Sequence, residues 1–336
     1  MRRAHLTTAL LAAASLVLVG CGGSDKPADD ESPAAQQVAG SDEVASTWPL
    51  TGLPVTGDES ASTTHPVLVT KMDNTESSSP QIGLGSADMV VEELVEGGLT
   101  RLAAFYYSDL PTRVGPVRSM RASDVGIVSP VDASVVTSGA ASKTIAIIKG
   151  AGIKYYPEGS AGISRDTTRS APYNVFADLT TIAKTAETDE ARPADYLPWG
   201  SEGDFPGGQA AKTIAASFGG GHTTNWTYDG KGYVNENTYA DQGDEFPADS
   251  VLVLRVQVGD AGYLDPAGNP VPETKLTGKG QAMLFHDGKV VRGTWTKSSL
   301  SAPIKLSTVG GDLTVPAGHT WIELVPAANG NVTFTK

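Results

Sequence analysis

The chain contains one cysteine, and its position limits how the rest of the protein can fold. Cys21 follows a short apolar stretch, residues 6–19, which begins behind Arg2 and Arg3 and ends in small residues. A basic start, an apolar stretch and small residues before a cysteine are typical of a lipoprotein signal peptide. We expect cleavage before Cys21 and lipidation of its thiol. With that thiol lipidated, no disulfide can form, so the fold must be held by its hydrophobic core.

The same segment predicts where the protein resides. The apolar stretch is too short to span a bilayer, which takes roughly 20 apolar residues. Two or three acyl chains on Cys21 would hold the protein firmly to the bilayer, at the extracytoplasmic face of the cell membrane. We therefore expect a signal peptide over residues 1–20 and a disordered tether over 21–46, which is rich in Ser, Asp, Ala and Pro. An ordinary secreted protein with an unmodified cysteine is the alternative.

The net negative charge of the chain argues against a nucleic-acid partner. The net charge is −13 at neutral pH, and a nucleic-acid-binding protein needs a basic surface. Anionic lipid headgroups would also repel this chain, so the acyl chains must provide the anchor. The chain is long enough, and at 40 % hydrophobic residues apolar enough, to form two domains.

Residues 47–200 predict an α/β domain with a mixed sheet. Apolar runs that end at turn residues predict strands, and patterns of helical spacing lie between them. We expect strands at 66–74, 87–94, 102–107 and 133–138. We expect helices at 119–128, with Ser119 as its N-cap, at 142–149 and at 180–191.

Residues 201–336 have a different pattern, in which short strands alternate with turns. We expect strands at 251–258, 281–285, 289–295 and 320–325, with a hairpin turn at Asp287-Gly288. This half should be a mostly antiparallel β domain. The predicted fold class is therefore mixed α+β, with an N-terminal α/β domain and a C-terminal β-rich domain.

Arginines are concentrated in the first domain. Six of the nine that follow the signal peptide lie between Arg101 and Arg169, beside turn glycines and prolines. The planar guanidinium group matches carboxylate and phosphate oxygens, so this enrichment favours an anion site. Arg118 and Arg121 would share one face of the first turn of the helix predicted at Ser119, next to its free backbone N–H groups.

Acidic and amide side chains fall in the same region. Asp73 and Asn74 end a predicted strand, where α/β sheets bind their ligands. Strand alternation places Glu92 on the opposite face from Glu93. We predict a cleft that binds a polar or anionic ligand, such as a cell-wall component, formed by Asp73, Asn74, Glu92, Arg101, Arg118, Arg121, Arg165, Asp166, Arg169 and Asn174. The arginines would bind the anion, and Asp73 and Glu92 would orient them.

Three other interpretations remain open. The acids and arginines form a buried ion-pair network that supports loops; the protein is a carboxylate- or metal-assisted hydrolase of phosphate-bearing or glycan substrates; or it is a structural partner of an envelope protein. Convergence of Asp73 and Glu92 with Arg118 would favour the cleft and the hydrolase. Their separation across the sheet would argue against both.

Signatures of enzymes are scarce. The motifs Gly-x-Ser-x-Gly, Gly-x-x-x-x-Gly-Lys-Ser/Thr and His-Glu-x-x-His are absent from the sequence. The four histidines of the mature chain have no metal-ligand spacing, and His286 and His319, at or near turns, are expected to be exposed. No cofactor is evident, although carboxylates could still bind Ca²⁺ or Mg²⁺.

Short motifs spread along the chain carry a family resemblance. They include Trp48-Pro49-Leu50-Thr51-Gly52-Leu53, Met72-Asp73-Asn74, Glu96-Gly97-Gly98-x-Thr100-Arg101, Gly115-Pro116-Val117-Arg118-Ser119-x-Arg121, Arg165-Asp166-x-x-Arg169-x-Ala171-Pro172-x-Asn174 and Gly318-His319-Thr320-Trp321. In this order they resemble the YerB-like family of bacterial lipoproteins. The resemblance implies an N-terminal α/β part and a C-terminal β-rich part, and it implies no biochemical activity.

One residue departs from the family pattern. Where the family usually has Ala-Pro-His-Asn, this chain has Tyr173 in place of the histidine. A tyrosine cannot simply replace a histidine that acts as a metal ligand or general base. The departure weakens the hydrolase interpretation for this chain.

Overall fold

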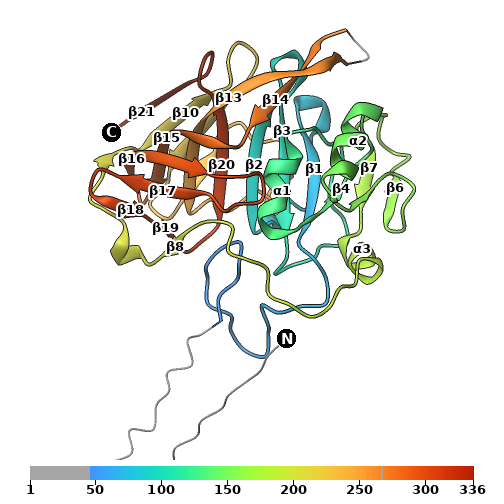
Figure 1. The fold of residues 1–336 in the computed structure, drawn as a ribbon, viewed down its shortest axis with the longest axis horizontal. Helices are drawn as coiled ribbons and strands as arrows, with labels where there is room; N and C mark the ends of the chain where they lie inside the picture. Colours follow the sequence, from blue (N-terminus) through green and yellow to red (C-terminus); the bar gives the residue numbers. More distant parts are fainter. Residues whose placement is uncertain (1–45, 266–267) are drawn as a thin grey trace, which may run out of the picture. The chain divides into compact units, whose positions relative to one another are not determined.

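A mixed β-sheet that draws strands from both halves of the chain organises the computed structural model, which describes residues 46–265 and 268–336 (Figure 1). Cys21, the signal peptide and nearly all of the predicted tether lie outside the described residues. The strand order is β18-β17-β16-β15-β13-β20-β2-β3-β1-β4-β5, with β14 paired to β13 and β9 to β16. The strands are β1 Leu68–Asn74, β2 Met89–Leu94, β3 Thr100–Tyr106, β4 Ser134–Val136, β5 Tyr155–Tyr156, β9 Gln209–Ala210, β13 Ser250–Leu264, β14 Pro270–Lys275, β15 Gly278–His286, β16 Lys289–Lys297, β17 Lys305–Thr308, β18 Gly311–Leu313 and β20 Thr320–Pro326.

Smaller sheets and short helices pack around this sheet. The second sheet has the order β12-β11-β10-β21, and two-stranded pairs are formed by β8 with β19 and β6 with β7. These strands are β6 Ile163–Arg165, β7 Val175–Ala177, β8 Trp199–Gly200, β10 Thr213–Ser217, β11 Thr223–Tyr228, β12 Tyr233–Asn235, β19 Val315–Pro316 and β21 Asn331–Thr335. The helices are α1 Asp124–Val128, α2 Ser142–Gly150 and α3 Leu179–Thr185, with 3₁₀ turns η1 Glu76–Ser78, η2 Leu84–Ser86, η3 Glu96–Gly98, η4 Ser129–Val131 and η5 Glu202–Asp204.

Strand β20 joins the two halves of the chain. It lies between β2 and β13 and runs parallel to both, with Glu323 opposite Glu92. All seven of its residues are buried, which fits a strand covered on both faces. The predicted mixed character of the fold is therefore right, but strands dominate and the expected division near residue 200 is crossed by one sheet. The domain division itself stays a prediction.

Two of the predicted helices are shorter than expected. The helix expected over 119–128 covers only Asp124–Val128 and follows Ser123, so Ser119 does not cap it. The Arg118 N–H donates to the Lys71 carbonyl, which extends this segment along the end of β1. The helix expected over 180–191 ends at Thr185, because the chain after it pairs with residues 63 and 64 through Thr188 and Ala191. Tertiary hydrogen bonds override local helix preference in both places.

The register of three strands assigns the charged residues to two faces. Asp73 and Glu93 both stand opposite Arg101 on β3, whereas Glu92 stands opposite Leu102. Because side chains alternate along a strand, Lys71, Asp73, Glu93 and Arg101 share the face that packs on α1 and α2. Asn74 and Glu92 lie on the opposite face, whose core includes Leu68, Val90 and Trp226.

The predicted hairpin turn is confirmed. His286 pairs with Lys289, and Asp287 and Gly288 have positive φ values of 47° and 66°. Two consecutive positive values are those of a type I′ turn, which Asp-Gly favours. Among the described helices, none is long and apolar enough to cross a membrane.

Candidate functional site

Three arginines and two acids meet where β1 and β3 reach the segment before α1. This arginine cluster consists of Asp73, Glu96, Arg101, Arg118 and Arg121. Arg118 Nη1 lies 3.2 Å from Asp73 Oδ2. Arg121 forms a bidentate ion pair with Glu96, in which the Nε–Oε1 and Nη2–Oε2 distances are both 2.7 Å. Arg101 donates from Nη1 to the Ser119 carbonyl at 2.8 Å.

The arginine cluster has one cation more than its own acids can neutralise. Arg101 is 6 % exposed, and its Nε is buried without a hydrogen-bond partner among the described residues. Burial, followed by repulsion from Arg121 and Arg118, lowers the pKa of Arg101 to about 9. Burial alone would raise the pKa of Glu96. The hydrogen bond and the charge of Arg121 have the larger combined effect, so that pKa is lowered. The charge of Arg101 is therefore costly, and an added anion would relieve that cost.

A cavity of about 470 Å³ opens beside this cluster. Glu96, Ser119 and Arg121 line one side, and Ala140, Tyr263 and Leu264 are among the residues that complete it. Ligand pockets of small molecules range over roughly 300–1,000 Å³. The cavity can therefore hold a small anion or the end of a larger ligand next to Arg121.

A second group of charges lies on the same face of the sheet. The Lys71 ammonium is 2.7 Å from both Glu93 and Asp124, and all three side chains are fully buried. Burial lowers the pKa of Lys71, yet the two acids outweigh it and raise that pKa. Burial raises the pKa of Glu93, so the acid in excess is pushed toward its neutral form. Lys71, Glu93 and Asp124, which we call the lysine trio, connect β1 and β2 to the start of α1.

Four of the predicted site residues gather near the β6–β7 hairpin. Arg165 pairs with Glu158 and donates to Asn174 Oδ1 at 2.6 Å, while Asp166 pairs with Arg113. Arg169 donates to the carbonyls of Ser78 and Pro80. These contacts hold the loop of the β6–β7 hairpin in place. The Arg165 side chain is 43 % exposed and faces solvent.

Tyr173 links this loop to the arginine cluster. The Arg118 guanidinium lies 5.0 Å from the centroid of the Tyr173 ring, which is cation–π distance. Tyr173 therefore covers one face of an arginine in the cluster. A tyrosine here can position Arg118 but offers no imidazole for acid–base chemistry at neutral pH.

The prediction that Glu92 converges with Asp73 and Arg118 is wrong. Glu92 and Asn74 lie on the opposite face of the sheet, where Asn74 Nδ2 donates to Glu92 Oε1 at 3.0 Å. Glu92 also accepts from Thr224 at 2.9 Å and from the Trp321 indole at 3.2 Å. The ten predicted residues thus occupy an arginine cluster, a hairpin loop and a separate buried acid site.

The buried acid site joins the two halves of the chain. His222 Nε2 lies 3.1 Å from Glu92 Oε1, and Glu323 receives the Trp226 indole N–H at 2.9 Å. Burial works to raise the pKa of Glu92, but His222 and neighbouring hydroxyl groups leave it lowered. Burial and the charge of Glu92 raise the pKa of Glu323 well above its ordinary value. Glu92 is therefore the ionised partner of His222, and Glu323 is the neutral acid.

A serine–histidine–glutamate arrangement occurs at the start of β13. Ser250 Oγ lies 2.9 Å from His286 Nδ1, and His286 Nε2 lies 2.8 Å from Glu202. Ser250 is fully buried, so it cannot meet a substrate as a nucleophile. The expectation that His286 is exposed is wrong, because this ring is 6 % exposed and packs on Phe205. His319 is only partly exposed and lies next to Asp249.

The described part of the chain contains no set of side chains arranged to bind a metal ion. No group of three or more His, Cys, Asp or Glu side chains converges there as a metal site. Charge-assisted hydrogen bonding to an anion is the chemistry that the arginine cluster can perform.

Several of these residues were not predicted from the sequence. Lys71 and Glu323 are charged residues inside otherwise buried strands, and that interruption of an apolar run was a usable signal. His222 follows three glycines and carries no pattern that could have revealed its contact with Glu92.

Two family models match this chain. The N-terminal domain of the protein of unknown function DUF3048 matches residues 50–192, and its C-terminal domain matches residues 214–322. The chain belongs to this family. The predicted resemblance to the YerB-like family is thereby confirmed, since the chain is also 27 % identical over 296 residues to "Putative lipoprotein YerB" of Bacillus subtilis (strain 168). That alignment covers 83 % of this chain and 86 % of the relative.

A solved structure supports the fold. The crystal structure of the YerB protein from Bacillus subtilis superimposes with a TM-score of 0.70, covering 85 % of this chain and 99 % of that chain. At 23 % identity this likeness concerns the fold alone. A fold does not by itself imply a function, so function has to be argued from the site.

Proposed function

We propose that this protein is a lipid-anchored protein of the cell envelope that binds an anionic ligand through the arginine cluster. The name of its Bacillus relative and the signal-peptide pattern around Cys21 support the anchor, at the extracytoplasmic face of the membrane. The ligand carries a carboxylate or phosphate group, as cell-wall polymers and many small metabolites do. This proposal retains Asp73, Arg101, Arg118 and Arg121 from the predicted site.

One observation carries the proposal. Three guanidinium groups face two acids within the cluster, and the buried Nε of Arg101 has no partner among the described residues. A cluster that only supported loops would be expected to satisfy its buried donors. The cavity would place an anion next to Arg121, which belongs to the same cluster as Arg101 and Arg118.

The hydrolase alternative loses its main argument. It depended on Asp73 and Glu92 acting together, and the two carboxylates lie on opposite faces of the sheet. The same separation argues against the cleft of ten residues, so the anion site proposed here is a smaller one that leaves out Glu92 and Asn74. The interpretation as a structural partner of an envelope protein remains the alternative that a failed ligand search would favour.

Thermal unfolding of the full chain in detergent tests the proposal. The panel contains sugar phosphates, nucleotides, muropeptides and teichoic acid fragments, each with and without Mg²⁺ or Ca²⁺. A ligand at about 100 times its Kd adds about 2.7 kcal/mol to the free energy of unfolding, which raises the melting temperature measurably. We expect one class of anion to do this.

Two matched variants locate the effect. Arg118→Gln should abolish the ligand-dependent rise in melting temperature, since it removes a guanidinium from the cluster. Arg165→Gln removes an arginine that faces solvent and pairs with Glu158, so the rise should persist. No shift with any anion, or an equal shift in Arg118→Gln, would refute the proposal.

A further inference from the structure

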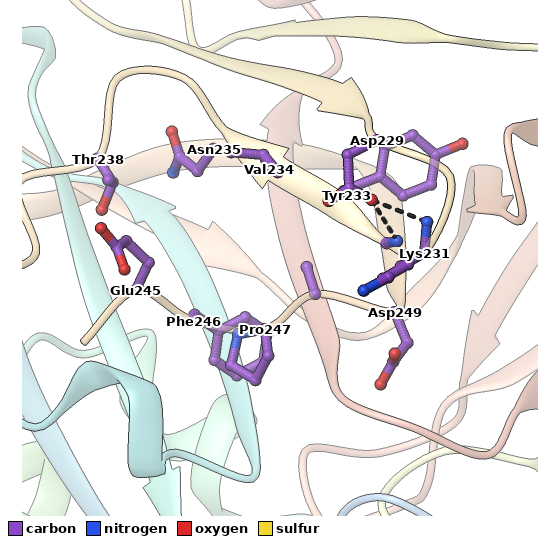
Figure 2. A pocket seen from close by; sticks show the side chains of 12 residues that line it. Asp229, Lys231, Tyr233, Val234, Asn235, Thr238, Glu245, Phe246, Pro247 and Asp249 are labelled. Atoms are coloured by element: carbon purple, nitrogen blue, oxygen red, sulfur yellow. Dashed lines mark hydrogen bonds between the residues drawn. The ribbon is translucent and has the colours of Figure 1, made fainter. Parts of the chain in front are cut away.

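A second cavity, of about 410 Å³, lies between strand β12 and the segment 245–249 (Figure 2). Its lining shares no residue with the cavity at the arginine cluster. Its volume is in the range of ligand pockets, roughly 300–1,000 Å³. This inference is therefore independent of the proposed anion site.

One wall of this cavity is the free edge of a sheet. Strand β12 is the outer strand of the sheet β12-β11-β10-β21. The Tyr233 N–H points away from β11 and donates to the Ala248 carbonyl at 2.7 Å, whereas the Glu236 N–H donates to Asn225 on β11 at 2.8 Å. Backbone groups alternate along an antiparallel strand, so the N–H and C=O of Asn235 point to the same side as those of Tyr233.

Beyond Tyr233, nothing pairs with that edge in the part of the chain the structure describes. The contact between β12 and the segment 245–249 is a single bridge, Tyr233 to Ala248. The two segments then separate, and the cavity fills the space between them. An edge with unpaired N–H and C=O groups is a template for one more strand.

The side chains around this edge suit an amphipathic ligand. Phe246 and Pro247 form an apolar side of the cavity, and Val234 is 45 % exposed. Figure 2 shows the side chains of Asn235, Thr238 and Glu245 near one end of the cavity. One oxygen of Glu245 accepts from the Gly243 N–H at 2.9 Å, which leaves the other oxygen for a ligand.

The charge of the lining selects the partner. Three carboxylates, from Asp229, Glu245 and Asp249, face one ammonium group, that of Lys231. The whole chain carries a net charge of −13. A partner with basic side chains is therefore attracted at long range and neutralised in the cavity.

We infer that this groove binds a short, extended peptide segment carrying basic side chains. The peptide adds a strand to the edge of β12 by bonding to the backbone of Asn235. Its apolar side chain packs on Phe246 and Pro247, and a lysine or arginine side chain meets Glu245. The partner is thus a basic segment of another polypeptide.

Fluorescence anisotropy of the full chain in detergent, at physiological salt, tests this inference. The probe is a dye-labelled, acetylated and amidated Val-Lys-Val-Lys-Val peptide. We expect saturable binding that weakens at least tenfold in Glu245→Gln. Glu236→Gln makes the same charge change on an exposed residue outside the cavity and should bind as well as the unmodified protein.

Two altered peptides test the strand geometry without altering the protein. N-methylation of the peptide's valines and lysines removes backbone donors and should weaken binding at least tenfold. Val-Glu-Val-Glu-Val should not bind. Absence of binding by the lysine peptide, equal weakening by Glu236→Gln and Glu245→Gln, or full binding of the N-methylated peptide would each overturn the inference.

Discussion

Replacing Lys71 by methionine is expected to lower the free energy of unfolding by about 3–5 kcal/mol. The substitution keeps an unbranched side chain of similar length but removes the ammonium group that lies 2.7 Å from both Glu93 and Asp124. Two fully buried carboxyl groups would then lack their cation. An unpaired buried charge is among the most destabilising changes a core can suffer. Urea unfolding at neutral pH measures the loss.

A second buried lysine provides the control. The Lys297 ammonium donates to the carbonyls of Ser299, Leu300 and Ala302 and has no acid partner among the described residues. Lys297→Met leaves no charge unpaired and should cost clearly less than Lys71→Met. Adding Glu93→Gln to Lys71→Met should restore part of the stability, because a neutral amide replaces a buried carboxyl group that has lost its cation. Equal losses for the two lysines would contradict the role assigned to the trio.

His222→Gln is expected to lower the free energy of unfolding by about 1.5–3 kcal/mol near pH 5.5, and by much less near pH 9. The lost interaction is the charged hydrogen bond between His222 Nε2 and Glu92, two side chains that are 10 % and 0 % exposed. His222 lies on the connection between β10 and β11, and Glu92 on β2. This bond therefore joins the C-terminal half of the chain to the N-terminal half.

The pH window follows from the two pKa shifts. The pKa of folded His222 is raised above 6.5, so its contribution is complete below pH 6.5 and is lost as pH rises through the folded value. The pKa of folded Glu92 is lowered below 4.5, so its contribution is complete above pH 4.5 and is lost as pH falls through the folded value. The pair therefore stabilises the protein most between pH 4.5 and pH 6.5.

Urea unfolding of the unmodified protein and His222→Gln at both pH values tests this window. His65→Gln serves as the control, because the His65 ring contacts the Pro66 carbonyl and the Tyr107 ring instead of a carboxylate. Its effect should not grow at about pH 5.5. A His222→Gln effect that is equal at the two pH values would show that the bond is not ionic.

Local pattern predicted most strands but could not predict how they assemble. Apolar runs bounded by turns were enough to find β1, β2, β3 and β20. The insertion of β20 between β2 and β13 depends on pairing over more than 200 residues, for which the sequence has no local signal. The helix predicted at Ser119 begins later because the chain there bonds to other segments: the Arg118 N–H donates to Lys71 on β1, and the Met120 N–H donates to Gly139.

The candidate site was predictable in its residue types and only partly in its geometry. Arginines beside turn residues identified Arg101, Arg118 and Arg121, and the structure brings these three together. Alternation correctly separated Glu92 from Glu93. Whether Glu92 shares a face with Asp73 depends on how β1 and β2 register against β3, and one chain's residue pattern does not determine that register.

Crystals of the protein soaked in selenate would test the arginine cluster most directly. Selenate has the shape and charge of a phosphate or sulfate dianion, and its selenium can be located by anomalous scattering. We expect an ordered selenate within hydrogen-bond distance of Arg101 or Arg121, at the cavity lined by Glu96 and Ser119. Selenate bound only at other surface positions, with the arginine cluster empty, would contradict the central claim that these arginines form an anion-binding site.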